Sequence, residues 1–334
     1  MSDTTPAPTV RLSELIEGFW TTQVIHAAAQ LKLADILHAE PLLPEELAQR
    51  ADAHVGSVRR LLRAMATLGL CQITPEGRCA LTEMGALLRT DAAGGKRARA
   101  LFAGSSLYHA FAMLPETVRS GRRPPVTADF GKSSPEQLAV FQQAMIESSR
   151  EAVGAAVPVY DFRALTRVLD VGGGFGGALA GLLERFPHLH GDVLDLDHAQ
   201  PGAEAFLARS GVKSRAGFIA GDFFRSAPTG YDGHLLKFIL HDWDDAQAVT
   251  ILKSCRAAAG PGTRLIVLER LVPEHPGDRP AHRTVMQADM TMMAWGGQER
   301  TEREYRELFE QAGFQLSRVV PTASAFTVIE GRPV

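Results

Sequence analysis

The feature that most constrains the fold is an alternation of apolar and helical segments after residue 165. Five apolar segments have strand character: TRVLDV (166–171), HGDVLDLD (190–197), AGFIAGDFF (216–224), DGHLLKFILH (232–241) and TRLIVLERLV (263–272). Helical segments separate them at 177–186, 202–211 and 245–259. Strands alternating with helices predict a doubly wound α/β domain with a parallel sheet and right-handed crossovers. The tail adds a helix (EREYRELFEQAGF) and two strands that could close the sheet as an antiparallel pair.

The N-terminal part has a different pattern. Helical segments at 24–37, 42–51 and 54–73 precede two short extended pieces around 70–73 and 79–82, which is the order of a winged helix. We therefore predict three regions: a winged-helix-like domain at 1–90, a helical linker at 91–158 that contributes to the acceptor pocket, and the α/β domain at 159–334. Within the linker, GRRPPVTADFGKSSPEQ (121–137) is expected to be a loop because of its glycine, proline and serine content.

Composition narrows the classes of partner. The 334 residues carry a net charge of -3, so no global basic field favours nucleic acid or anionic membrane. Arg59, Arg60 and Arg63 could enter a DNA groove, but packing of this domain against a second copy is the favoured interpretation. No apolar run approaches the roughly 20 residues of a membrane span, and no signal peptide is evident. Three cysteines form neither a disulfide framework nor a metal-ligand pattern, so a cytoplasmic location is expected.

A glycine-rich turn, LDVGGGFGG (169–177), joins the first strand to the first helix. Gly172, Gly174 and Gly177 satisfy G-x-G-x-x-G, and Asp195 ends the next strand, where a carboxylate can bind ribose hydroxyls. The turn alone fits either a nicotinamide dinucleotide or S-adenosylmethionine. Asp222 in GDFF follows the third strand, and no lysine or arginine for a pyrophosphate lies beside the turn. These features favour S-adenosylmethionine.

The stretch LLKFILHDWDDAQ (235–247) ends an apolar strand with a histidine. His241 follows the fourth strand, at the edge where ligands bind in such sheets, and is a candidate general base for a hydroxyl. The alternative is a structural or acceptor-orienting residue, with Asp242 or Asp244 capping the next helix. Lys237 lies within the same apolar strand, where a buried lysine needs a hydrogen-bonding or charged partner. A methionine-rich segment, MQADMTMMAW, could contact a flat aromatic ligand or be ordinary core.

In order and spacing, DVGGGFGG, DLDHA, GDFF, LLKFILHDWDD, VLERLVPE and GGQERT resemble the S-adenosylmethionine-dependent small-molecule O-methyltransferases of the caffeate and hydroxyindole type. The resemblance covers nearly the whole chain and implies that the winged-helix domain is a dimerisation module. It assigns the base to His241, two acids that position the base to Glu269 and Glu299, and an acceptor contact to Met145. The residues expected to bind the cofactor are Gly172, Gly174, Asp195, Leu196, Asp222, Phe223 and Lys237.

The sequence therefore predicts a homodimeric, cytoplasmic O-methyltransferase that uses S-adenosylmethionine to methylate a hydroxyl of a small aromatic metabolite, such as a phenol, polyketide or phenazine-like compound. Met145, Asp289, Met290 and Met293 are expected to bind the acceptor, and no metal, nucleic acid or membrane is expected to take part. AWGGQER lacks the polar residue and proline of plant members, so plant acceptors are not implied. An NAD(P)-dependent oxidoreductase and a winged-helix regulator that binds S-adenosylmethionine are the alternatives.

Overall fold

Residues 7–123 and 134–334 are described by the structure, a computed structural model in which the chain divides into two units. The first unit contains the described residues up to His109 together with 134–144. The second contains 110–123 and 145–334. The expected linker, 91–158, is thus shared between the units. Of the expected loop at 121–137, residues 124–133 lie outside the described residues, and a helix already begins at Pro135.

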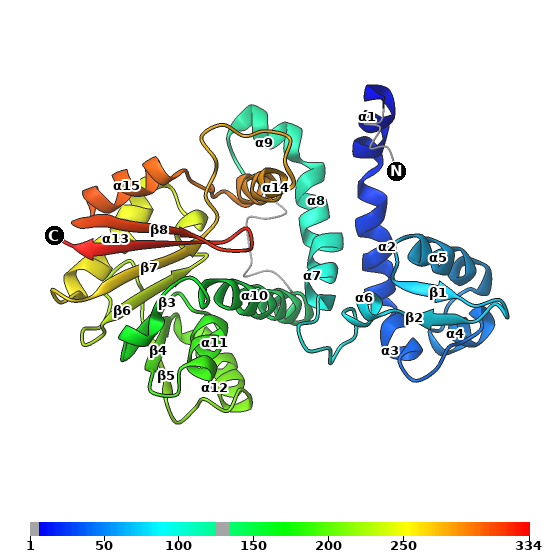
Figure 1. The fold of residues 1–334 in the computed structure, drawn as a ribbon, viewed down its shortest axis with the longest axis horizontal. Helices are drawn as coiled ribbons and strands as arrows, with labels where there is room; N and C mark the ends of the chain where they lie inside the picture. Colours follow the sequence, from blue (N-terminus) through cyan, green and yellow to red (C-terminus); the bar gives the residue numbers. More distant parts are fainter. Residues whose placement is uncertain (1–6, 124–133) are drawn as a thin grey trace. The chain divides into compact units, whose positions relative to one another are not determined.

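The first unit contains short helices with a two-stranded wing between α5 and α6 (Figure 1). In α5 (Val55–Thr67), Val58, Leu62 and Met65 are buried at helical spacing, and β1 (Cys71–Ile73) pairs antiparallel with β2 (Cys79–Leu81). Cys71 and Cys79 are both buried in this core. The other helices of this unit include α1 (Pro8–Glu17), α2 (Phe19–Gln30), α3 (Leu33–Leu37), α4 (Pro44–Arg50), α6 (Glu83–Ala86), α7 (Arg97–Phe102), a π-helical turn at Ala103–Leu107, and parts of α8 (Tyr108–Ala112) and α10 (Pro135–Ala156), which both extend into the second unit.

The second unit is built on a seven-stranded sheet in the order β5-β4-β3-β6-β7-β9-β8 (Figure 1). The first five strands in that order are parallel, and β9 runs antiparallel to both β7 and β8. The prediction of a doubly wound sheet closed by an antiparallel pair is confirmed. The strands are β3 (Arg167–Val171), β4 (His190–Asp195), β5 (Ala216–Ala220), β6 (Gly233–Lys237), β7 (Arg264–Glu269), β8 (Phe314–Pro321) and β9 (Thr327–Pro333).

Alternating strand residues form two apolar layers, because successive side chains point to opposite faces of a sheet. Val168 packs with α10 (Pro135–Ala156), α11 (Gly177–Arg185) and α12 (Gln200–Arg209). Leu169 packs on the opposite face with α13 (Asp245–Ala258) and α15 (Glu302–Gln311). Two further helices, α9 (Leu114–Ser120) and α14 (Pro280–Trp295), contact each other. Both sheet faces are therefore covered, and the carboxyl ends of the parallel strands are left for function.

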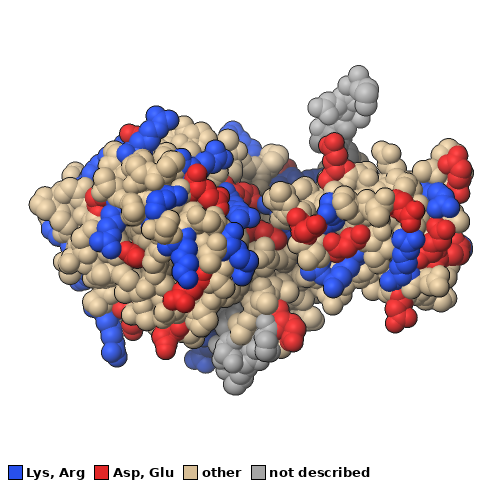
Figure 2. Space-filling view, turned by 90° about the horizontal axis from the view of Figure 1, so that it is seen from below, with Lys and Arg blue, Asp and Glu red and all other residues tan. Residues whose placement is uncertain are grey.

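The described helices and the distribution of surface charge agree with the composition of the chain. No helix among the described residues is both long and apolar enough to cross a membrane. Figure 2 shows a face on which basic and acidic side chains are interspersed. The three arginines of α5 are exposed, and one of them, Arg59, pairs with Glu45. That nucleic acid is not a partner stays a prediction.

Candidate active site

The glycine turn lies directly against the segment that carries His241. Gly172 has φ +68°, and a Cβ atom there would lie 2.5 Å from Cδ1 of Ile239. A larger residue would thus be strained in its backbone and would collide with a side chain two residues from His241. The backbone N–H of Gly174 donates to Oδ2 of Asp195 at 2.7 Å, so the turn and the acid of the next strand meet as the spacing predicts.

A buried aspartate lies next to the glycine turn, at the end of β3. Asp170, the penultimate residue of β3, is buried and accepts the backbone N–H of Leu179 at 3.2 Å. Burial raises the pKa of Asp170 to about 7, although the charge of Lys237 opposes the shift. Burial likewise lowers the pKa of Lys237 to about 8. Asp170 is not among the predicted site residues, although a carboxylate inside an apolar strand is a visible signal.

The remaining predicted cofactor residues fit a nucleoside. Asp222 follows β5, and its Oδ1 accepts the N–H of Phe224 at 2.9 Å. Phe223 is half-buried, and its ring lies 6.3 Å from the ring of Trp243. Leu196, directly after Asp195, is exposed despite being apolar. Carboxylates can accept hydrogen bonds from the hydroxyl and amino groups of adenosine, and partly exposed apolar side chains can pack on its flat base. The two kinds of side chain together therefore suit adenosine.

His241 is buried at the carboxyl end of β6 and pairs with an acid 58 residues away. Its Nδ1 lies 3.1 Å from Oε1 of the buried Glu299, and its Nε2 lies 3.6 Å from Oδ1 of Asp242. The ring stacks on Phe238 with centroids 5.1 Å apart. Burial alone would lower the pKa of His241, but the carboxylates of Asp242, Glu269 and Glu299 outweigh it and raise the pKa to about 9. In the structure as described, the imidazole therefore holds its proton at neutral pH.

Glu269, the second acid predicted to position the base, binds the backbone of the segment. Its Oε1 accepts the N–H groups of Ile239 at 3.0 Å, Leu240 at 2.8 Å and His241 at 3.3 Å. Its other oxygen accepts the hydroxyl of Tyr305. Glu269 is completely buried, so these hydrogen bonds replace the solvation that a carboxylate needs. The two acids therefore act on different atoms of the same residue.

The GGQER loop donates hydrogen bonds to the backbone carbonyls of the segment that carries His241. The N–H of Gln298 donates to the carbonyl of His241 at 2.8 Å. The buried guanidinium of Arg300 donates to the carbonyls of Leu240 and Trp243, both at 2.7 Å. A Cβ on Gly297 would lie 2.0 Å from the His241 carbonyl oxygen, so only glycine fits. The roles of Arg300 and Tyr305 were not predicted, although Arg300 lies in the GGQERT motif and Tyr305 follows it by four residues.

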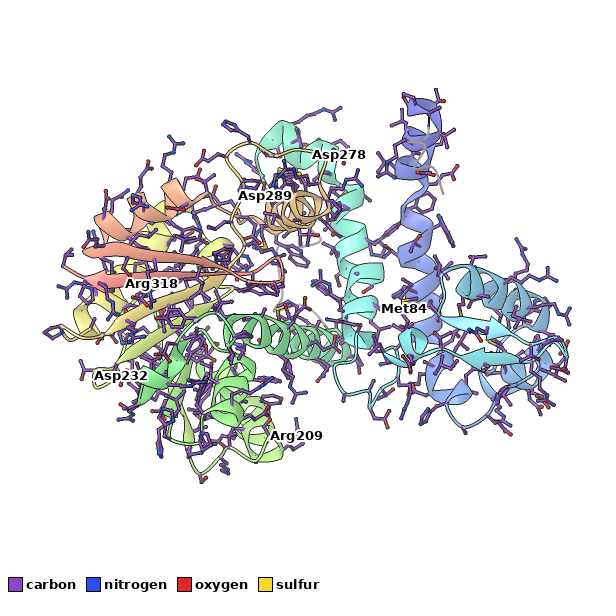
Figure 3. The ribbon with its side chains drawn as sticks, in the orientation of Figure 1. Met84, Arg209, Asp232, Asp278, Asp289 and Arg318 are labelled. Carbon is purple, nitrogen blue, oxygen red and sulfur yellow. The ribbon has the colours of Figure 1, made fainter. Side chains whose placement is uncertain are left out.

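The predicted acceptor residues are placed on two helices of the second unit. Met290 and Met293 are partly exposed on α14, whereas the neighbouring Met292 is buried. Met145, on α10, is also partly exposed. Asp289, labelled in Figure 3, accepts the backbone N–H of Glu299 at 3.1 Å and so touches the loop that holds His241.

One group of side chains has the composition of a metal site. Ligand atoms of His241, Glu269 and Glu299 lie within 4.8 Å of one another. However, Glu269 already accepts four hydrogen bonds, and Nη1 of Arg270 lies 3.5 Å from the Glu299 oxygen that faces His241. The group is thus organised as a hydrogen-bonded set, and the expectation of no metal stays a prediction.

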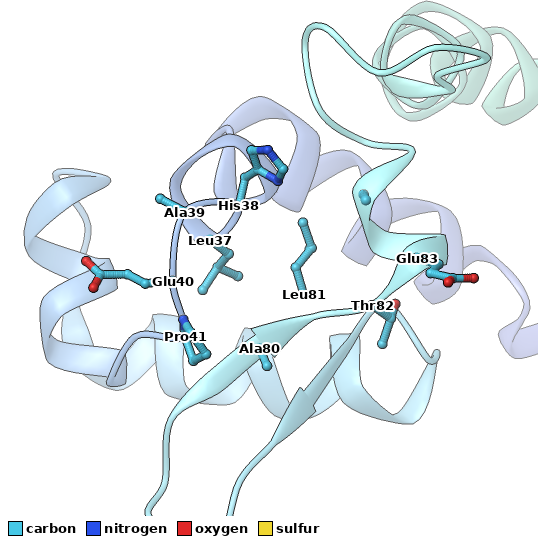
Figure 4. A pocket seen from close by; sticks show the side chains of 10 residues that line it. Leu37, His38, Ala39, Glu40, Pro41, Ala80, Leu81, Thr82 and Glu83 are labelled. Carbon is cyan, nitrogen blue, oxygen red and sulfur yellow. The ribbon is translucent and has the colours of Figure 1, made fainter.

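A pocket in the first unit is separate from these residues. It lies between the end of α3 and the second wing strand, and is lined by residues that include Leu37, His38, Leu81 and Glu83 (Figure 4). None of the predicted site residues lines it.

The strand order, the glycine turn with its acid and the buried His–Glu pair together define a methyltransferase of the Rossmann-like class that uses S-adenosylmethionine. Residues 112–315 match the model of the O-methyltransferase domain, and residues 13–91 match that of the O-methyltransferase dimerisation domain. The chain therefore belongs to the O-methyltransferase family, and it is an S-adenosylmethionine-dependent O-methyltransferase. The comparisons support neither the dehydrogenase nor the regulator.

Several relatives are similar over almost their whole length. The chain is 34% identical to the phenazine O-methyltransferase of Lysobacter antibioticus, over 97% of this chain and 96% of the relative. It is 36% identical to the 2,7-dihydroxy-5-methyl-1-naphthoate 7-O-methyltransferase of Streptomyces carzinostaticus, over 90% and 91%. Among solved structures, LaPhzM superposes with a TM-score of 0.91 at 34% identity, covering 98% of this chain and 100% of the other.

Proposed function

We propose that this methyltransferase acts on a hydroxyl of a small fused-ring aromatic metabolite and that His241 is its general base. The observation that carries the proposal is the buried pair of His241 Nδ1 and Glu299 Oε1 at 3.1 Å, beside the glycine turn. One relative is named for phenazine and another for a dihydroxynaphthoate, and both names denote fused aromatic ring systems. Partly exposed Met145, Met290 and Met293 are adaptable apolar contacts for such rings.

In the proposed mechanism, Nδ1–H donates to Glu299, which leaves Nε2 free to accept the hydroxyl proton. Because the pKa of His241 is raised to about 9, the imidazolium must first lose its proton. Asp242 offers a route, since its half-exposed carboxylate lies 3.6 Å from Nε2. When bound, S-adenosylmethionine supplies an activated methyl group for the acceptor oxygen. We assign its binding to Gly172, Gly174, Asp195, Leu196, Asp222, Phe223 and Lys237.

The test compares His241→Asn with His190→Asn, a change at an exposed histidine of β4. Hydroxylated phenazines and naphthoates are offered with S-adenosylmethionine, and the demethylated cofactor and methylated products are measured by mass spectrometry. A general base contributes about 10²–10⁴-fold, so we expect His241→Asn to lose turnover by that order while calorimetry gives unchanged cofactor affinity. The loss should grow with the pKa of the acceptor hydroxyl. Equal turnover in both variants for a weakly acidic phenol would refute the base.

We further propose that the protein is a homodimer through its N-terminal helices. Helix α1 has no buried residue, yet it carries exposed Val10, Leu12, Leu15 and Ile16. A ten-residue helix is marginal unless an apolar face is packed, so α1 needs a partner. The match of 13–91 to a dimerisation domain supports a second copy. The expected cytoplasmic location stays a prediction.

Light scattering on a sizing column tests the dimer. Ile16→Asp should yield a folded monomer, because the 67% exposed side chain contributes little to the fold of one chain. Val118→Asp, at a 66% exposed valine outside the matched dimerisation domain, is the control and should stay dimeric. A wild-type monomer at micromolar concentration would refute the proposal.

A further inference from the structure

The segment that carries His241 begins with a strained residue. Phe238, a bulky residue, has φ +59°, in the left-handed region that such residues rarely adopt. Its ring stacks on the His241 imidazole. Strain of this kind persists only where surrounding contacts fix the backbone. The orientation of His241 therefore depends on whatever holds residues 238–241.

One carboxylate oxygen binds the backbone N–H groups of this segment. Oε1 of Glu269 accepts three successive backbone N–H groups, those of Ile239, Leu240 and His241. A carboxylate can accept several N–H groups at once, whereas a protonated carboxyl accepts them weakly. Burial favours the protonated form and raises the pKa of Glu269. The hold on His241 thus requires that Glu269 remain ionised in a buried place.

Tyr305 contributes to that requirement from α15. Its side chain is completely buried, and its hydroxyl donates to Oε2 of Glu269, the oxygen that the backbone does not use. A donated hydrogen bond stabilises the ionised form of a buried carboxylate and lowers its pKa. The hydroxyl also fixes the rotation of the carboxylate, so that Oε1 faces the three N–H groups.

We propose that Tyr305 is a positioning residue for His241, which acts through Glu269 and touches neither cofactor nor acceptor. This inference rests on the proposed role of His241 as the base. The simpler interpretation is that Tyr305 is a core residue of α15, whose ring centroid lies 6.3 Å from that of Phe309. Its hydrogen bond to Glu269 would then only satisfy a buried hydroxyl. The two interpretations differ in what the loss of the hydroxyl does to turnover.

The chain offers a matched control. Tyr160 is also a buried tyrosine whose hydroxyl donates to a buried glutamate, Glu330. Glu330 on β9 lies opposite Ile266 of β7, whereas Glu269 is at the strand's carboxyl end. Three residues along a strand are about 10 Å, so the Tyr160–Glu330 pair lies about that far along the sheet from Glu269. Tyr160→Phe and Tyr305→Phe thus remove the same hydroxyl from a buried glutamate, although Glu330 also pairs with Arg318 and Arg332.

The experiment measures kcat, acceptor KM, cofactor affinity and melting temperature for both variants. We expect similar small losses of melting temperature. Tyr305→Phe alone should lower kcat, by roughly ten- to a hundred-fold, because misplacing a reacting group by about 1 Å costs that order. The KM and the cofactor affinity should stay within about two-fold, since binding contacts are untouched. If Tyr305→Phe matches Tyr160→Phe in kcat, the proposal is overturned.

A double-mutant cycle identifies the path. If Tyr305 acts through Glu269, Tyr305→Phe should lose no further turnover in a Glu269→Gln background. Additive losses would overturn the proposal, even if the single variant is slow. The base itself is tested separately by His241→Asn: full turnover there refutes the proposed function. Loss there, together with unchanged turnover in Tyr305→Phe, refutes this inference alone.

Discussion

Changing Glu299 to glutamine isolates its charge from its shape. The amide oxygen of glutamine can still accept the Nδ1–H of His241 now held at 3.1 Å, so the tautomer should be retained. A hydrogen bond to a charged group contributes about 1.5–3 kcal/mol and one between neutral groups about 0.5–1.5 kcal/mol, so the charge assistance that is lost is worth about 1–1.5 kcal/mol. One pKa unit corresponds to about 1.36 kcal/mol, so the pKa of His241 should fall by about one unit.

Neighbouring charges keep this shift of the His241 pKa from being larger. Nη1 of Arg270 lies 3.5 Å from the same Glu299 oxygen and already offsets part of its charge. Asp242 and Glu269 also remain to raise the pKa of His241. We therefore expect the pKa of His241 to fall from about 9 to about 8.

The assay is the pH dependence of kcat/KM, between roughly pH 6 and 10, with an acceptor whose hydroxyl does not titrate there. The base must be unprotonated, so activity should rise with pH through the pKa of His241. Glu299→Gln should move this rising limb to lower pH. Glu302→Gln, which removes an exposed acid paired with Arg306 on α15, is the control and should leave the limb in place. An unmoved limb in an active Glu299→Gln enzyme would refute the electrostatic argument.

Three further changes follow from the packing. Gly297→Ala should lower kcat at least about ten-fold, since its Cβ would lie 2.0 Å from the His241 carbonyl, whereas Gly262→Ala, which meets open space, should be silent in the same kinetic assay. Gly172→Ala should weaken cofactor binding measured by calorimetry by at least about ten-fold, because positive φ and the collision both distort the turn. Burial lowers the pKa of His234 to about 4, below its unfolded value, so this residue by itself should contribute about 2 kcal/mol less stability at pH 5 than at pH 7, as the unfolded chain takes up the proton. Urea unfolding at both pH values should show that the stability of His234→Leu relative to the wild type increases by this amount from pH 7 to 5, and an unchanged difference would contradict the assignment.

Local patterns allowed much of the fold to be predicted. Apolar runs bounded by turn residues marked the strands, and GGG after the first strand marked a turn in which Gly172 and Gly174 have positive φ. Asp244 caps α13 by accepting the N–H of Gln247 at 2.8 Å, one of the two acids expected there. These features are set by residues a few positions apart, whose conformational preferences act before any tertiary contact forms.

The sequence by itself determined the parallel sheet, the glycine turn and the position of His241 at the end of β6. The tertiary structure alone decided how His241 is held: Glu269 binds its backbone, Glu299 binds its ring, and Arg300 and Tyr305 complete the frame. The two residues of each of these hydrogen bonds are 28 to 60 positions apart in the chain. Their roles depend on which oxygen faces which N–H after the sheet and α15 have packed. Burial and neighbouring charge set the pKa of a side chain, and both exist only in the folded protein.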